Sequence, residues 1–152
     1  MKLLNFQLSQ PFISIHLLGL DFTWDLHNAG TFHGLKLNAS DNTLVMSWSV
    51  EGNPAPKYSE CDLVFTGLKL LIISPRDEEL PNSEDSCVSG ISKVIPGTAD
   101  KPDSRMRMRR EWAASDPFHL LFQFQSGRDI EIDAETVGLV GIEHGSAGQF
   151  GQ

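Results

Sequence analysis

The residues with the clearest chemical potential in this chain lie within WDLHNAGTFHGLKL, residues 24–37. Asp25 and His27 are two positions apart, so an extended strand would present both on one face. His33 lies six positions further on and would share that face if the strand were unbroken. Carboxylate and neutral imidazole are suitable ligands for zinc or iron. The stretch therefore raises the hypothesis of a metal-dependent or catalytic site.

Spacing argues against a metal centre at these residues. Six residues of straight strand span about 20 Å, so His27 and His33 could share an ion only if the chain bends near Gly30. A third ligand would have to come from His16 or His119, and the sequence selects neither. The favoured interpretation is that the histidines line a polar sheet face or cap a turn. We therefore expect no metal and no other cofactor.

Other signatures of catalysis are missing from the sequence. It contains no G-x-S-x-G elbow and no Gly-rich phosphate loop. Cys61 alternates with apolar residues, which predicts an inert core thiol, and Cys87 has no evident base beside it. Glu131 and Asp133 alternate with isoleucines, as solvent-facing strand residues do, although such a polar face could also bind a sugar or a protein. The sequence favours a protein that is not an enzyme.

The segment RMRMRR, residues 105–110, is the one cluster of basic residues. If it forms a strand, its alternate arginines make a row on one face. Binding of single-stranded nucleic acid would also require aromatic side chains between them, and the segment contains none. We expect this row to contact the acidic run at 77–85, within the molecule or in a homo-oligomer. The candidate binding residues from the sequence are Trp24, Asp25, His27, His33, Arg105, Arg107 and Arg109.

The charge of the whole chain points to the same class of partner. A net charge of −8 and a pI of about 4.9 disfavour nucleic acid and anionic membrane, because binding phosphates requires a positive field. An acidic surface instead attracts a basic protein.

The elements that must position these residues are β-strands. LVMSWSV at 44–50 places apolar residues on one face and polar residues on the other, and FHLLFQFQ at 118–125 does the same. The segments interpreted as strands are 12–20, 31–37, 44–50, 60–66, 68–74, 118–125, 129–135 and 136–142. Only 86–94 could form a short helical turn. Seven to nine strands separated by turns predict an all-β fold, an antiparallel β-sandwich or barrel.

Turn residues and apolar runs refine this prediction. NASDN at 38–42 closes a hairpin between 31–37 and 44–50, and Gly127 supplies the turn of a second hairpin. Gly67 is expected to end the strand 60–66 or to form a β-bulge before the next strand. The following segment, 68–74, is nearly all apolar, which predicts a central strand covered on both faces.

A chain of 152 residues fits one domain, which we place at residues 1–144. Residues 75–104 hold four prolines and many polar residues, which predicts a long irregular loop, and the Gly-rich tail at 145–152 is expected to be disordered. Polar residues interrupt the first twenty positions, so a signal peptide is not expected, and no run is long enough to span a membrane. These features indicate a cytoplasmic protein with reduced thiols.

Three stretches together resemble a known group of proteins. They are W-D-L-H-N-A (24–29) followed by L-V-M-S-W (44–48), then D-L-V-F-T-G-L-K-L-L (62–71), and the hairpin F-H-L-L-F-Q-F-Q-S-G-R-D-I-E-I-D-A (118–134). The order is similar to that of small bacterial all-β proteins of unknown function, some of them classed as immunity proteins of polymorphic toxin systems. The resemblance covers about half the chain and implies protein binding without catalytic residues.

Three functions follow from these observations. The favoured one is a non-catalytic acidic binding module for another, basic protein, of the immunity type. A small metal-dependent hydrolase on a β-barrel, using Asp25, His27 and His33, is the alternative from another class. A ligand carrier, in which a barrel encloses an apolar cavity, is the third.

Overall fold

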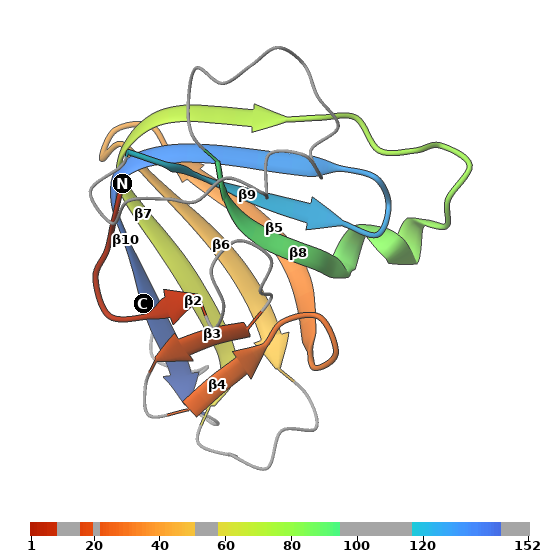
Figure 1. The fold of residues 1–152 in the computed structure, drawn as a ribbon, viewed down its shortest axis with the longest axis horizontal. Coiled ribbons are helices and arrows are strands. Elements are labelled where there is room, and N and C mark those ends of the chain that lie inside the picture. Colours follow the sequence, from red (N-terminus) through yellow and green to blue (C-terminus); the bar gives the residue numbers. More distant parts are fainter. Residues whose placement is uncertain (9–15, 20–21, 51–57, 95–116, 144–152) are drawn as a thin grey trace, which may run out of the picture.

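The computed structural model confirms the all-β class (Figure 1). It describes residues 1–8, 16–19, 22–50, 58–94 and 117–143. The strands are β1 (Lys2–Leu3), β2 (Gln7–Leu8), β3 (His16–Gly19), β4 (Phe22–Asp25), β5 (Gly30–Asn38), β6 (Thr43–Val50), β7 (Tyr58–Ile73), β8 (Val88–Val94), β9 (His119–Phe124) and β10 (Asp129–Glu143). One 3₁₀ helix, η1 (Asn82–Ser86), precedes β8. The main sheet has seven strands in the order β5-β6-β7-β10-β9-β8, and β1 pairs with β10.

The main sheet curls into a half-barrel because its two longest strands, β7 and β10, bend at the same place (Figure 1). On β7, Phe65 and Leu68 both pack into the core although they are three positions apart, and Ala134 and Val137 do so on β10. A regular strand would put such residues on opposite faces. The bend falls at Gly67, whose φ of +66° is a left-handed conformation that favours glycine. A register shift just before Ala134 accompanies it.

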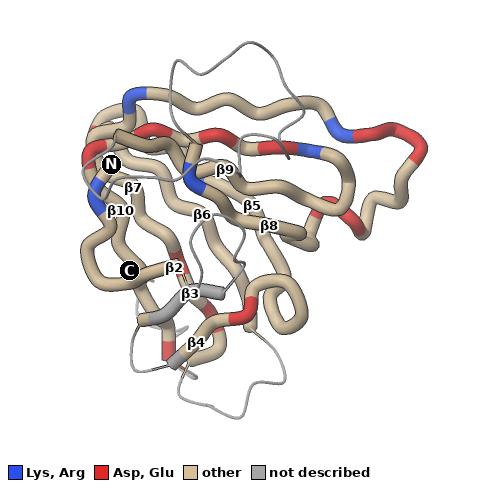
Figure 2. The backbone as a smooth tube through the Cα atoms, viewed as in Figure 1, with Lys and Arg blue, Asp and Glu red and all other residues tan. Residues whose placement is uncertain are grey.

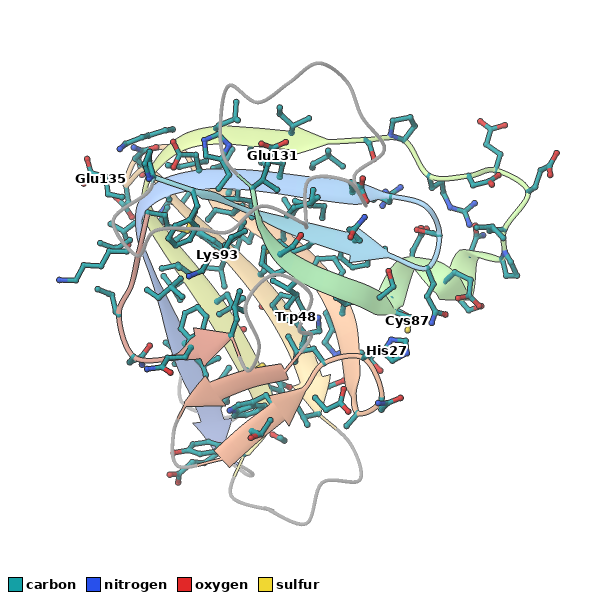
Figure 3. All side chains as sticks on the ribbon, in the orientation of Figure 1. His27, Trp48, Cys87, Lys93, Glu131 and Glu135 are labelled. Carbon is teal, nitrogen blue, oxygen red and sulfur yellow. The ribbon has the colours of Figure 1, made fainter. Side chains whose placement is uncertain are left out.

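Aromatic side chains fill the concave side of this curl. Trp48, labelled in Figure 3, and Phe122 are fully buried, with ring centroids 6.1 Å apart. Phe65 meets Phe122 edge-on at 6.3 Å, and Phe32 lies 5.1 Å from Trp48. These contacts tie β5, β6 and β7 to β9 across the curl. Aromatic pairs of this geometry stabilise a fold beyond the area that they bury.

A small antiparallel sheet of β2, β3 and β4 packs against the main sheet (Figure 1). The Asn5 side chain joins the two: its Nδ2 donates to the Leu139 carbonyl at 2.7 Å, and the Leu139 N–H donates to its Oδ1 at 2.7 Å. Phe6 and Trp24 are buried in the common core, and the Trp24 ring lies 5.9 Å from that of Tyr58. The N-terminal segment is therefore part of the hydrophobic core.

The predicted hairpins are confirmed. Segments 31–37 and 44–50 form the antiparallel pair β5 and β6, and segments 118–125 and 129–135 form β9 and the first part of β10. Gly127 lies in the second turn with a φ of +77°, a conformation that glycine adopts without strain.

The predicted irregular loop at 75–104 is wrong in its middle part, because residues 88–94 form strand β8. The short helical turn that 86–94 could have formed is absent, and the only helical turn in this described part ends at Ser86. A register shift between Val88 and Gly90 interrupts the alternation that would have revealed the strand. Strand β8 also contains Ser89, Ser92 and Lys93, which made the segment resemble a polar loop.

The predicted central position of 68–74 is also wrong. This segment continues 60–66 as one strand, β7, but β6 pairs with β7 only as far as Thr66. Beyond that residue β7 lies at an edge of the described sheet, where Ile72 and Ile73 are 49% and 47% exposed. Segments 129–135 and 136–142 likewise form a single strand, β10. A purely apolar run does not distinguish an edge strand from a central one.

Candidate functional site

Asp25 is the last residue of β4, and His27 lies in the turn that joins β4 to β5. The Asp25 carboxylate accepts hydrogen bonds from the backbone N–H groups of His27, at 3.1 Å, and Asn28, at 3.0 Å. The Asn28 Nδ2 also donates to it, at 2.7 Å. An Asp that accepts from the following backbone amides stabilises a turn, whereas the sequence interpretation had given such a role to the histidines. Trp24, the preceding candidate, is fully buried and packs in the core.

His33 occupies a different environment. Phe32 pairs with Trp48 and Gly34 pairs with Ser47, so His33 is the extra residue of a β-bulge. Its side chain is exposed on the edge strand β5, whereas the His27 ring contacts the start of β8. Within the described part of the chain, no group of three or more His, Cys, Asp or Glu side chains is placed to hold a metal ion.

Several sequence predictions fall outside the described residues. These are the arginine row of Arg105, Arg107 and Arg109, the tail at 145–152 and the last part of the segment 75–104. The backbone of His16 lies in β3, but its side chain is among those not described.

The one thiol–imidazole pair in the described residues is Cys87 with His27 (Figure 3). The Cys87 Sγ lies 3.7 Å from His27 Nδ1, although the residues are 60 positions apart. That nitrogen also lies 2.8 Å from the Val88 carbonyl oxygen, which can only accept. Nδ1 must therefore carry the hydrogen that it donates to Val88. It cannot act as the base that removes a proton from the Cys87 thiol.

The environment of both thiols also disfavours the reactive thiolate. Partial burial raises the pKa of Cys87 above its ordinary value of 9.0, and the Glu84 carboxylate adds to this shift. Burial, reinforced by Asp62, raises the pKa of Cys61 far above the same value. Catalytic thiols need the opposite environment, in which a positive group lowers the pKa. Cys61 is therefore the inert core thiol that its sequence pattern predicted, and Cys87 is a structural contact.

These environments predict the order of thiol reactivity. At pH 7.5, Cys87 in the folded protein should react with an aromatic disulfide reagent more slowly than free cysteine, because its raised pKa leaves less of it as thiolate. Cys61 should react only when the protein unfolds. Absorbance of the released thiolate follows both reactions, and the variants Cys61→Ser and Cys87→Ser assign them. A Cys87 that reacts faster than free cysteine would show an activated nucleophile.

An exposed and strongly charged element is the segment 74–87, which we call the acidic arm. It leaves the end of β7, projects beyond the sheet and returns through η1 to β8 (Figures 1 and 2). Its acidic residues are Asp77, Glu78, Glu79, Glu84 and Asp85. Three of them, Asp77 to Glu79, are consecutive and exposed, and the neighbouring Leu80 is 37% exposed.

Arg76 braces this arm, in addition to backbone hydrogen bonds such as that from the Asp77 N–H to the Ser126 carbonyl, at 2.8 Å. Arg76 donates through Nη2 to the carbonyl oxygens of Leu80, at 2.6 Å, and Pro81, at 2.9 Å. Its Nε donates to Asp85 Oδ1 at 3.2 Å. The nearby Ser126 hydroxyl, together with Arg76, holds the pKa of the Asp85 carboxyl below its ordinary value of 3.8. The arm is therefore a braced loop on which Asp77, Glu78 and Glu79 are exposed.

A second acidic group lies on the convex face of the sheet. His119 Nδ1 lies 2.8 Å from Glu131 Oε1, and its Nε2 lies 3.5 Å from Asp133 Oδ2. The three side chains are only 13%, 20% and 21% exposed. The pattern of Glu131 and Asp133 predicted a solvent-facing row, but it did not show that His119 would lie between them. Because these carboxylates are paired and largely covered, they are less available to a partner than those of the arm.

Comparison of the chain with family models, curated proteins and solved structures finds no match. No helix in the described residues is both long enough and apolar enough to cross a membrane. The arrangement of side chains therefore carries the functional argument. The strongest feature of this arrangement is the braced acidic arm.

Proposed function

We propose that this protein is a non-catalytic acidic binding module that recognises a basic protein through its acidic arm, as an immunity protein blocks a basic toxin. The single observation that supports the proposal is the projecting, exposed run of Asp77, Glu78 and Glu79, held in shape by Arg76. Its two reduced thiols suit the cytoplasm, where such a protein would protect its own cell.

Three properties of the arm favour binding of this kind. Consecutive carboxylates attract a basic surface over a distance and accelerate association. The brace from Arg76 means that little conformational freedom is lost when a partner binds. Leu80, partly exposed beside the carboxylates, offers an apolar contact that a partner could bury.

The distribution of charge over the chain supports the same partner class. The 20 Asp and Glu residues of the chain outnumber its 12 Lys and Arg residues, so its surface is acidic. A basic protein is the macromolecule that this surface would attract most strongly.

The other two functions receive less support from the structure. A carrier would keep the inside of the curl for its ligand, but Trp48, Phe65 and Phe122 occupy that space. A hydrolase using Asp25, His27 and His33 would need these side chains to converge. Asp25 instead accepts a hydrogen bond from the His27 backbone, the His27 ring contacts the Val88 carbonyl, and His33 lies at a β-bulge. The binding module requires no such convergence.

A capture experiment with two matched variants tests the proposal. The tagged wild-type protein is used to isolate stoichiometric partners from an extract of the source cell. The arm variant Glu78→Lys/Glu79→Lys is compared with Glu60→Lys/Glu135→Lys, whose two glutamates are equally exposed on the sheet. Both variants change the net charge by the same amount, so only a specific role of the arm distinguishes them.

We expect the wild-type protein and the sheet variant to retain one basic partner, and the arm variant to lose it. The dissociation constant for the arm variant should rise at least about tenfold, since a like charge in an interface costs several kcal/mol. Equal retention by both variants would contradict the proposal, as would the absence of any stoichiometric partner of the wild-type protein.

A further inference from the structure

The second half of β7 forms an edge of the sheet that the described residues make up. From Leu68 to Ile73 it pairs with β10 on one side, and no described strand pairs with its other side. Figure 1 shows this part of β7 at the upper margin of the sheet. Ile72 and Ile73 are about half exposed there, and Lys69 is the only charged residue of the segment. An open apolar edge of this kind is a template for pairing with another strand.

The register of β7 shows which backbone groups face outward. The Ser74 N–H donates to the Asp129 carbonyl at 2.9 Å, so the backbone groups of Ser74 point toward β10. Because these directions alternate along an antiparallel strand, those of Ile72, opposite Glu131, point the same way. The N–H and C=O groups of Leu71 and Ile73 must then point out of the sheet.

We propose that a second copy of this chain pairs with this edge, antiparallel, with the two-fold axis at Ile72. Leu71 of each copy then lies opposite Ile73 of the other, and each such pair exchanges N–H···O bonds in both directions. The two Ile72 side chains meet at the axis. The interface is isologous, as in most homodimers, and it continues the sheet across both molecules.

Charge and hydrogen bonding select this register over its neighbours. It places Lys69 opposite Pro75 of the other copy, next to the acidic arm that begins there. A shift that centres the axis on Leu71 sets Lys69 against Ile73 of the other copy, so the charged side chain then lies opposite an apolar one. A shift that centres it on Ile73 sets Leu71 against Pro75, which has no N–H to donate, in the pairs nearest the axis that have outward-facing partners; in the proposed register Pro75 lies only in the outer pair with Lys69.

The acidic residues do not oppose this pairing. The two copies of β10 would be separated by three strand spacings, about 14 Å, which exceeds the screening length of about 8 Å at physiological salt. Lys69 lies at the new interface and offsets part of the charge. The dimer is independent of the proposed function, because binding by the acidic arm does not require it.

Sedimentation equilibrium over a range of concentrations tests the proposal. The wild-type protein should show reversible association from monomer to dimer. Ile72→Lys should weaken the dimer at least about tenfold, because it places two like charges about 5 Å apart at the axis. Leu37→Lys is the matched control, since Leu37 is 50% exposed on another edge strand and should leave association unchanged.

A mixing experiment tests the position of the axis. Ile72→Glu should weaken the dimer as Ile72→Lys does, and an equimolar mixture of the two variants should associate again because opposite charges then meet. Thermal unfolding checks that every variant is folded. A wild-type protein that stays monomeric overturns the proposed dimer. Equal dimer association of Ile72→Lys and Leu37→Lys would also overturn it, as would failure of the mixture to associate. None of these results bears on capture of a partner by the arm.

Discussion

Replacement of Phe122 by alanine should lower the free energy of unfolding by about 3–5 kcal/mol. Phe122 is fully buried, and its ring contacts those of Trp48 and Phe65, so it links β9 to β6 and β7 across the curl. Alanine would leave a cavity that this close-packed interior could only partly refill. Urea unfolding followed by tryptophan fluorescence measures the change.

An exposed apolar residue provides the control. Leu37→Ala on β5 should change the free energy of unfolding by no more than about 0.5 kcal/mol, because half of that side chain already faces solvent. If Phe122→Ala cost less than about 1 kcal/mol, the interior of the curl would have to contain space, as a carrier requires. The filled core described above would then be wrong.

Replacement of Gly67 by valine should lower the free energy of unfolding by about 2 kcal/mol. The φ of +66° at Gly67 lies in the left-handed region, which a β-branched residue adopts only with strain. A Cβ at this position would also lie 2.6 Å from the Glu135 Cγ, so that side chain would have to move. Urea unfolding of purified Gly67→Val measures the loss.

Two further variants separate the causes of this loss. Gly67→Asn should cost less than Gly67→Val, because asparagine tolerates the left-handed conformation. Gly67→Val combined with Glu135→Ala removes the steric contact and should keep most of the loss, since the backbone strain remains. If Gly67→Val were as stable as the wild-type protein, the bend of β7 would not depend on glycine at this position.

Much of the main sheet could be predicted because its strands alternate cleanly. Trp48 and its apolar neighbours on β6 point into the core, and Phe122 and Ile132 do so in the hairpin of β9 and β10. That period of two is imposed by the geometry of an extended chain. Glycines at turns were equally informative, because Gly127 adopts a positive φ that other residues disfavour.

The errors have definite physical causes. A bulge after Val88 moves the apolar residues of β8 out of a simple alternation, so the strand resembled a loop. The apolar run from Leu68 to Ile73 resembled a buried strand, but whether a neighbour covers it depends on where β6 ends. Both are long-range properties of the sheet, which local patterns do not encode.

The candidate site shows the same limit. The hydrogen bonds of the Asp25 turn are local, but the sequence interpretation gave the capping role to the histidines and not to Asp25. The contact between His27 and Cys87 could not be inferred, since it joins residues 60 positions apart. The acidic arm was visible as composition, but its brace depends on Arg76 reaching the carbonyls of Leu80 and Pro81.

The central claim, that the acidic arm binds a basic protein, is tested most directly by a footprint of carboxylates. A carbodiimide labels exposed carboxylates, and mass spectrometry compares labelling of the free protein with that of its complex with the captured partner. We predict that the partner protects Glu78 and Glu79 and leaves Glu60 and Glu135, equally exposed on the sheet, unchanged. Protection of the sheet glutamates with full labelling of the arm would contradict the account.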